Sequence, residues 1–170
     1  MEEGALYNMT AFWMCAHNGT HIDAPYHFLR EGETVDCLPL TKTVGLAYVS
    51  EFNGNVTAED ARAMLCQAQR TKDGAEKRIL IKGKATVTAE AAEVFAGAGI
   101  DLVGNESQTV GPVGAAMEVH LILLRAGVVL LEGIRLEDVP EGVYFLNAAP
   151  LSLKGSDGAP CRAILVETEE

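Results

Sequence analysis

The chain has 170 residues, of which 48% are hydrophobic and 22% are charged, a balance typical of a soluble globular protein the size of one domain. Its formal net charge is −11, and the acidic residues are spread along the sequence. This charge repels nucleic acids and anionic membranes, so we expect neither as a partner.

Three further features bear on where the protein resides. The sequence starts Met1-Glu2-Glu3-Gly4, which lacks the basic residues and the long apolar stretch of an export signal. The most apolar region, residues 119–136, carries four polar or charged side chains and is too polar for a lipid-facing span. Four scattered cysteines are read as reduced thiols. We therefore expect a cytoplasmic protein.

The first elements are read from composition and from residues that break or cap helices. Residues 6–16 (LYNMTAFWMCA) are rich in aromatic and apolar residues and predict a leading strand. Residues 17–27 cannot form a regular helix, because Gly19 is a poor helix former and Pro25 would cost a helix interior about 3 kcal/mol. Strand or turn is expected there.

The remaining elements alternate at first and are mainly strands near the end. Thr57 followed by Asp60 predicts the capped start of a helix over residues 58–69, and Thr88 the start of another over 89–99. A third helical segment spans residues 114–127. The pattern predicts a mixed α/β fold with one or more sheets and about three helices. The expected strands are residues 44–52, 77–83, 100–104, 128–134, 143–153 and 160–167, the last two joined through the turn-forming residues 154–159 (KGSDGA).

Three of the four histidines lie in the eleven residues 17–27, HNGTHIDAPYH. His17, His21, Asp23 and His27 share one parity and would line one face of an extended chain. A straight strand separates residues 17 and 21 by roughly 13 Å, whereas two nitrogens on one metal ion lie only about 3–4 Å apart. The chain must therefore bend, and Asn18-Gly19 is where it can. The alternative is a set of ordinary surface histidines.

A cation site needs more ligands than this segment supplies, and two polar residues in apolar surroundings are candidates. His120 lies in MEVHLILL, and Glu132 lies in VVLLEGI. A buried imidazole or carboxylate requires a partner, and one ion site would satisfy both. Each could instead face solvent or form hydrogen bonds.

The stretch HNGTHIDAPYH matches His-x-Gly-Thr-His-x-Asp-x-Pro-x-His, with seven of eleven positions fixed. In this it resembles the cyclase-like metal-dependent hydrolases, a family that includes bacterial kynurenine formamidase and isatin hydrolase. The resemblance continues through residues 120–167. It implies a compact α/β domain of the swivelling β/β/α type over residues 1–170, with a short N-terminal strand region, that assembles as a homodimer or homotetramer.

The resemblance also implies roles for individual residues. His17, His21 and Asp23 would hold a first divalent ion, and Asp23 would bridge to a second ion held by His120 and Glu132. Zinc is the first candidate and manganese the second, with one or two ions bound. His27 would be the catalytic histidine, and histidine as a residue type suits proton transfer at neutral pH.

The implied activity is hydrolysis of a linear or cyclic amide in a small-molecule substrate by water that the metal activates. Two alternatives remain open: a catalytically inactive member that binds metal or a small molecule, and a metal-dependent lyase or dehydratase.

Several other side chains have two readings each. Phe12 and Trp13 could form an aromatic wall for the substrate, or pack in the core or a subunit contact. Arg162 could pair with Glu132 or point outward. Other candidates near the site, each equally readable as an ordinary loop or surface residue, are Cys15, Lys82, Lys84 and Glu106.

Overall fold

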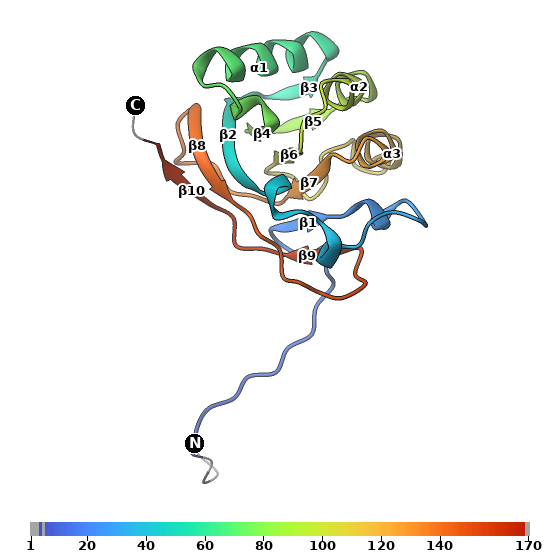
Figure 1. The fold of residues 1–170 in the computed structure, drawn as a ribbon, viewed down its shortest axis with the longest axis vertical. Coiled ribbons are helices and arrows are strands. Elements are labelled where there is room, and N and C mark those ends of the chain that lie inside the picture. Colours follow the sequence, from blue (N-terminus) through green and yellow to red (C-terminus); the bar gives the residue numbers. More distant parts are fainter. Residues whose placement is uncertain (1–3, 5, 169–170) are drawn as a thin grey trace.

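The computed structural model describes residue 4 and residues 6–168 and is built on an eight-stranded sheet (Figure 1). The strand order is β10-β8-β2-β4-β6-β7-β1-β9. The central strands β2, β4, β6 and β7 are parallel, and the strands added on either side are antiparallel to their neighbours. The strands of this sheet are β1 (His21–Asp23), β2 (Val44–Glu51), β4 (Arg78–Lys82), β6 (Leu102–Asn105), β7 (Val129–Glu132), β8 (Gly142–Asn147), β9 (Gly158–Pro160) and β10 (Ile164–Glu167).

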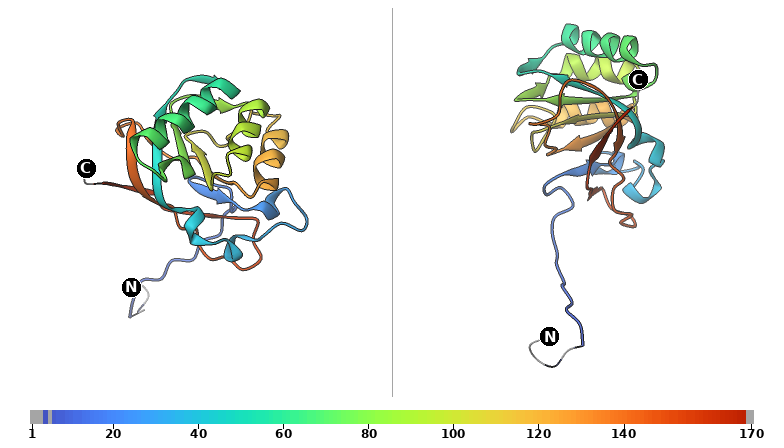
Figure 2. Two further views of the ribbon diagram at one scale, coloured as in Figure 1. Left: turned by 45° about the horizontal axis from the view of Figure 1, so that its top comes forward. Right: turned by 90° about the vertical axis from the view of Figure 1, so that its left-hand side faces the viewer.

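Three α-helices cover one face of the sheet (Figures 1 and 2). They are α1 (Ala58–Thr71), α2 (Ala89–Gly97) and α3 (Met117–Arg125). Thr57 and Asp60 form a reciprocal capping box at the start of α1, and the Thr88 hydroxyl caps α2, as the sequence predicts. Within the described residues, no helix is both long and apolar enough to cross a membrane.

Shorter elements connect these layers. A two-stranded parallel sheet pairs β3 (Gly54–Val56) with β5 (Ala85–Val87). Four single-turn 3₁₀ helices are η1 (Pro25–His27), η2 (Val35–Cys37), η3 (Leu40–Lys42) and η4 (Ala75–Lys77).

Alternation along the central strands divides the core into two layers. In β4, Ile79 and Ile81 pack with the helices, while Leu80 points into the second cluster on the opposite face. Both faces are buried, which explains why β4 reads as a continuous apolar run. Each fully buried aliphatic side chain contributes about 1.5–3 kcal/mol.

The predicted fold class is confirmed: three helices accompany a mixed, curled sheet. The predicted strand over residues 6–16 is wrong. This segment forms no strand and extends away from the body (Figure 1), and residues 6–15 are all exposed. Its composition favours a strand, but a strand also needs a neighbouring edge for its hydrogen bonds, which composition does not reveal.

Candidate metal centre

The turn between the first two histidines is made at Gly19, whose φ is +67°. Only glycine adopts this left-handed conformation without steric cost, so the predicted bend at Asn18-Gly19 is confirmed. The chain then enters β1, where His21 and Asp23 project from the same face. In the antiparallel pair β1–β7, His21 lies opposite Glu132, so three buried polar side chains are adjacent.

Two imidazoles are held in a defined orientation by carbonyl groups. The Nδ1 atom of His21 lies 2.9 Å from the carbonyl oxygen of Gly19, and that of His120 lies 2.9 Å from the carbonyl oxygen of Ala116. A carbonyl oxygen only accepts, so each Nδ1 carries a proton and donates it. The neutral form of each ring therefore presents an Nε2 lone pair to the centre, the arrangement common in metal-ligating histidines.

Both Nε2 atoms point at carboxylates. His21 Nε2 lies 3.3 Å from Asp23 Oδ1 and 3.5 Å from Glu132 Oε2. His120 Nε2, contributed by α3, lies 3.4 Å from Asp23 Oδ2 and 3.2 Å from Glu132 Oε1. Lone pairs facing carboxylate oxygens repel unless a proton or a cation lies between them. These separations match the roughly 3–4 Å expected between two ligands of one ion.

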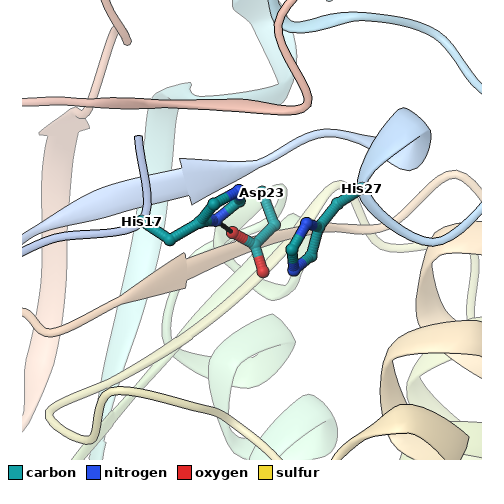
Figure 3. Close-up of side chains that lie close together, drawn as sticks. All are labelled: His17, Asp23 and His27. Carbon is teal, nitrogen blue, oxygen red and sulfur yellow. Dashed lines mark hydrogen bonds and ion pairs between the residues drawn. The ribbon is translucent and has the colours of Figure 1, made fainter. Parts of the chain in front are cut away.

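His17 and His27 form the outer part of the cluster (Figure 3). His17 Nδ1 lies 2.7 Å from Asp23 Oδ1, and its Nε2 lies 2.9 Å from Asp157 Oδ2. The His27 ring stacks on His17 with centroids 4.0 Å apart, and its Nδ1 is 3.1 Å from the same Asp157 oxygen. Asp157 therefore links the two rings.

The electrostatics of the cluster favour positive charge at its centre. The hydrogen bond to Asp23 is the main reason that the pKa of His17 rises to about 9. Burial lowers the pKa of His120, but the nearby carboxylates of Asp23 and Glu132 outweigh it and raise the pKa to about 10. Burial raises the pKa of Asp23, yet hydrogen bonds from the surrounding imidazoles bring it well below its ordinary value.

A divalent ion fits this donor set. Asp23 is 1% exposed, and its Oδ2 atom is buried without a hydrogen-bond partner. Such an atom normally costs about 1–3 kcal/mol, and an ion would satisfy it. The donor atoms form two groups, and within each group they lie within 4.8 Å of one another. The first group is His17, Asp23 and His27, and the second is His21, Asp23 and Glu132. Imidazole and carboxylate donors suit zinc or manganese.

The structure brings together all six residues that the sequence predicts for the site, four from the motif and two from distant parts of the chain: His17, His21, Asp23, His27, His120 and Glu132. The grouping differs in one respect from the resemblance, because His27 falls with His17 while His21 falls with Glu132. The sequence predicts only a turn at Asp157. The pairing of β9 with β1, in which Gly158 lies opposite Asp23, sets Asp157 beside the cluster, and the sequence carries no local signal for this pairing.

The remaining candidates lie elsewhere. Phe12 and Trp13 are 73% and 95% exposed on the extended N-terminal segment, Cys15 is exposed near its base, and Arg162 is exposed near β10. Glu106 accepts hydrogen bonds from the backbone N–H groups of Gly83 and Leu136 and so ties two loops together. Lys82 donates to the carbonyl of Val139, and Lys84 is exposed.

Comparisons with known proteins agree with this geometry. Residues 3–112 match the model of the family described as "Putative cyclase". A kynurenine formamidase of Salinibacter ruber is 35% identical over 96% of this chain and 82% of its own length. Another relative, the kynurenine formamidase of Erythrobacter litoralis, is 33% identical over 98% of this chain and 81% of its own length.

A solved structure described as a potential metal-dependent hydrolase with cyclase activity superposes with a TM-score of 0.80 at 33% identity, covering 92% of this chain and 82% of that one. The match over most of the chain, together with the His-x-Gly-Thr-His-x-Asp-x-Pro-x-His motif around the buried Asp23, shows that the chain belongs to the cyclase family of metal-dependent hydrolases.

Proposed function

We propose that this protein is a metal-dependent hydrolase that cleaves a linear or cyclic amide in a small-molecule substrate. The observation that carries the proposal is the convergence of the oriented Nε2 atoms of His21 and His120 on the carboxylates of Asp23 and Glu132. The Oδ2 atom of Asp23 is buried there without a hydrogen-bond partner. The kynurenine formamidase relatives support the amide as the bond that is cleaved.

His17, His21, Asp23, His120 and Glu132 would hold one or two divalent ions, with zinc as the first candidate, manganese as the second, and Asp23 shared between the ions. When bound, the metal would acidify a water molecule and polarise the amide carbonyl. The carbonyl oxygen of Gly19 orients His21, and the carbonyl oxygen of Ala116 orients His120. The backbone N–H of Val110 donates to Glu132 Oε1 at 2.8 Å and fixes that carboxylate.

His27 would move the proton. Its Nδ1 hydrogen-bonds to Asp157, so Nε2 is the atom that would accept the proton of the attacking water and pass it to the leaving nitrogen. Water supplies the hydroxyl to the carbonyl carbon, the C–N bond breaks, and the amine leaves with that proton. The Asp157 carboxylate would hold the ring in one tautomer and stabilise its charged form.

We further propose that the protein works as a homodimer or homotetramer in the cytoplasm. The kynurenine formamidase relatives, matched over most of their length, support a small molecule as the substrate. The formal charge of −11 repels nucleic acids and anionic lipid surfaces, which supports the proposal that neither is a partner.

The experiment measures bound metal and turnover on the same sample. Protein purified without added ions is analysed for metal, loaded with zinc or manganese, and assayed against formanilides, isatin and cyclic imides. The expected result is turnover of at least one amide that chelation abolishes and metal restores. Tight metal binding with an inert panel would instead support a binding protein. In heavy-oxygen water, a product acid without solvent oxygen would support a lyase.

A further inference from the structure

The N-terminal segment, residues 6–14, exposes large apolar side chains along its whole length. Leu6 is 92% exposed, Met9 is 81% exposed and Trp13 is 95% exposed. Tyr7 and Phe12 are 65% and 73% exposed. The segment extends away from the body of the protein (Figures 1 and 2). We call it the N-terminal arm. Its aromatic residues lie without cover from the rest of their own chain, which soluble proteins seldom tolerate in a contiguous stretch.

A second apolar feature lies on the face of the sheet opposite the helices. An open cavity of about 320 Å³ is lined there almost entirely by aliphatic side chains. Only Thr20 and Arg135 are polar among its lining residues, and β10, an edge strand of the sheet, contributes Leu165. The cavity is separate from the histidines, because Leu131 lines it whereas its neighbour Glu132 points to the other face. The apolar lining residues are Leu80, Leu131, Ile134, Leu136, Val139, Leu146, Ala163 and Leu165.

Charge limits the ways in which two copies of this protein can approach. Each copy carries a formal charge of −11, so contact between their acidic surfaces is repulsive. Residues 4–16, however, contain no charged side chain, although 22% of the whole chain is charged. An uncharged apolar arm and an apolar cavity are two surfaces that can meet without bringing like charges together.

We propose that the N-terminal arm of one copy docks in this apolar cavity of a second copy. This deepens the homo-oligomer proposed above by naming the contact that would form it. An extended arm of nine residues spans roughly 30 Å, at about 3.3 Å per residue, and can cross to a neighbouring molecule. Reciprocal exchange of two arms closes a twofold dimer in which both copies make the same contact.

The size of the exchanged surface is sufficient for a stable contact. Each buried aromatic side chain covers about 150–250 Å², and each arm carries three of them: Tyr7, Phe12 and Trp13. Two arms therefore bury on the order of 1,000 Å² through these residues, which reaches the range of specific interfaces. Because the arm leads directly into His17, docking would also anchor the chain that enters the metal centre.

Trp13 is the only tryptophan in the chain and provides a native probe for the test. Tryptophan emission, iodide quenching and mass by light scattering are measured on metal-loaded full-length protein across a hundredfold range of concentration. The expected result is a blue shift and protection from iodide that appear together with dimer mass. A variant with Leu6→Ser, Met9→Ser and Phe12→Ser, which keeps Trp13, should remain monomeric with solvent-exposed emission at every concentration.

Variants in β10 and just before it test the cavity. Leu165→Lys places a charge in the cavity and Ala163→Phe, at the residue before β10, fills it, and both should lose the dimer and the blue shift. Ile164→Lys on the opposite face of the same strand is the matched control and should keep both, with folding of all three checked by circular dichroism. Dimer mass with a solvent-exposed Trp13 would contradict docking of the arm but not the proposed homo-oligomer. Monomer mass at every concentration would contradict both proposals. A blue shift that does not depend on concentration would mean that the arm folds back onto its own chain, which also contradicts docking in a second copy. Dimers retained in both folded cavity variants would overturn the cavity as the acceptor.

Discussion

Asp23 lies between the imidazoles of three histidines. Two of them, His21 and His120, donate their Nδ1–H to backbone carbonyl groups, so each ring directs its Nε2 atom at the carboxylate. Its carboxylate contributes an oxygen to both donor groups in the cluster. Removal of this one side chain therefore removes a ligand from each group and, among the residues that the structure describes, leaves Glu132 as the one buried carboxylate of the centre.

We expect Asp23→Ala to lose at least nine-tenths of the bound metal, measured by elemental analysis after dialysis, together with turnover. Asp138→Ala, at an exposed carboxylate, is the control and should bind the same amount of metal as the unmodified protein. If Asp23→Ala kept its full metal content, Asp23 would not bridge the ions, and the ligand set would have to be drawn from the other residues.

His27 differs from the other histidines because its Nδ1 contacts only the half-exposed Asp157. We expect His27→Ala to keep its metal and to lower kcat by about 10²–10⁴, the usual contribution of a general acid–base group. Asp157→Asn keeps a hydrogen-bond acceptor beside Nδ1 and should lose less activity. Metal analysis alongside kinetics decides the role, because loss of metal in His27→Ala would make His27 a ligand, as its grouping with His17 and Asp23 allows.

At the scale of the elements, the close approach of β9 to β1 holds His17 in place. A Cβ atom on Gly158 would lie 2.7 Å from His17 Cε1 and 2.7 Å from the carbonyl oxygen of Ile22. Both contacts are too short for real atoms, and the carbonyl belongs to the rigid pair β1–β9. Only glycine, which has no Cβ atom, therefore fits at position 158 without a steric clash.

We expect Gly158→Ala to push His17 out of the cluster, to weaken metal binding at least tenfold, and to lower the free energy of unfolding by about 1–3 kcal/mol, as overpacking commonly does. Metal titration and chemical denaturation measure the two effects. Gly97→Ala, at the end of α2 where nothing lies within 4 Å of the new Cβ, should leave both unchanged or slightly improved. Unchanged metal affinity in Gly158→Ala would mean that His17 is not held by this contact.

Local chemistry made part of this architecture predictable. The capping residues Thr57 and Thr88 determine where two helices begin, because their hydroxyls satisfy backbone donors within the same turn. The parity of His21 and Asp23 and the turn at Gly19 also depend only on neighbouring residues. The rest depends on strand order: Asp157 reaches His17 across 140 residues because β9 pairs with β1, and the arm forms no strand because no edge lies beside it.

At the scale of the whole molecule, the curled sheet explains why distant parts of the chain meet at one centre. The strand β1 lies between β7 and β9, so it brings the motif next to Glu132 on one side and next to Asp157 on the other. Helix α3 packs against β7 and contributes His120 to the centre from the helical face of the sheet. The centre thus requires the complete sheet, and the protonation of its side chains is linked to global stability.

The protonation of the metal-free centre predicts how stability changes with pH. The pKa of His17 is raised to about 9 by its hydrogen bond to Asp23, and the pKa of His120 is raised to about 10, because its carboxylate partners outweigh burial. An unfolded histidine titrates near 6.5. Their stabilising contribution is therefore fully present below about pH 6.5 and is lost as the pH rises through about 9 and 10.

We expect the free energy of unfolding of metal-free protein to fall steadily between pH 7 and pH 8.5, by at most about 1.4 kcal/mol per pH unit for each of the two protons. Toward pH 8.5 the buried Cys161 thiol, whose pKa burial raises to about 12, adds a decline of its own, because the thiol of the unfolded chain begins to ionise there. Urea denaturation in chelator measures the slope. Metal-loaded protein at constant free ion is the matched comparison; it should keep the contribution of the thiol and lack that of the two imidazoles, because bound imidazoles carry no extra proton. A slope in chelator no steeper than that of metal-loaded protein would mean that the metal-free imidazoles are neutral, and that the carboxylates of the cluster do not hold protons on them.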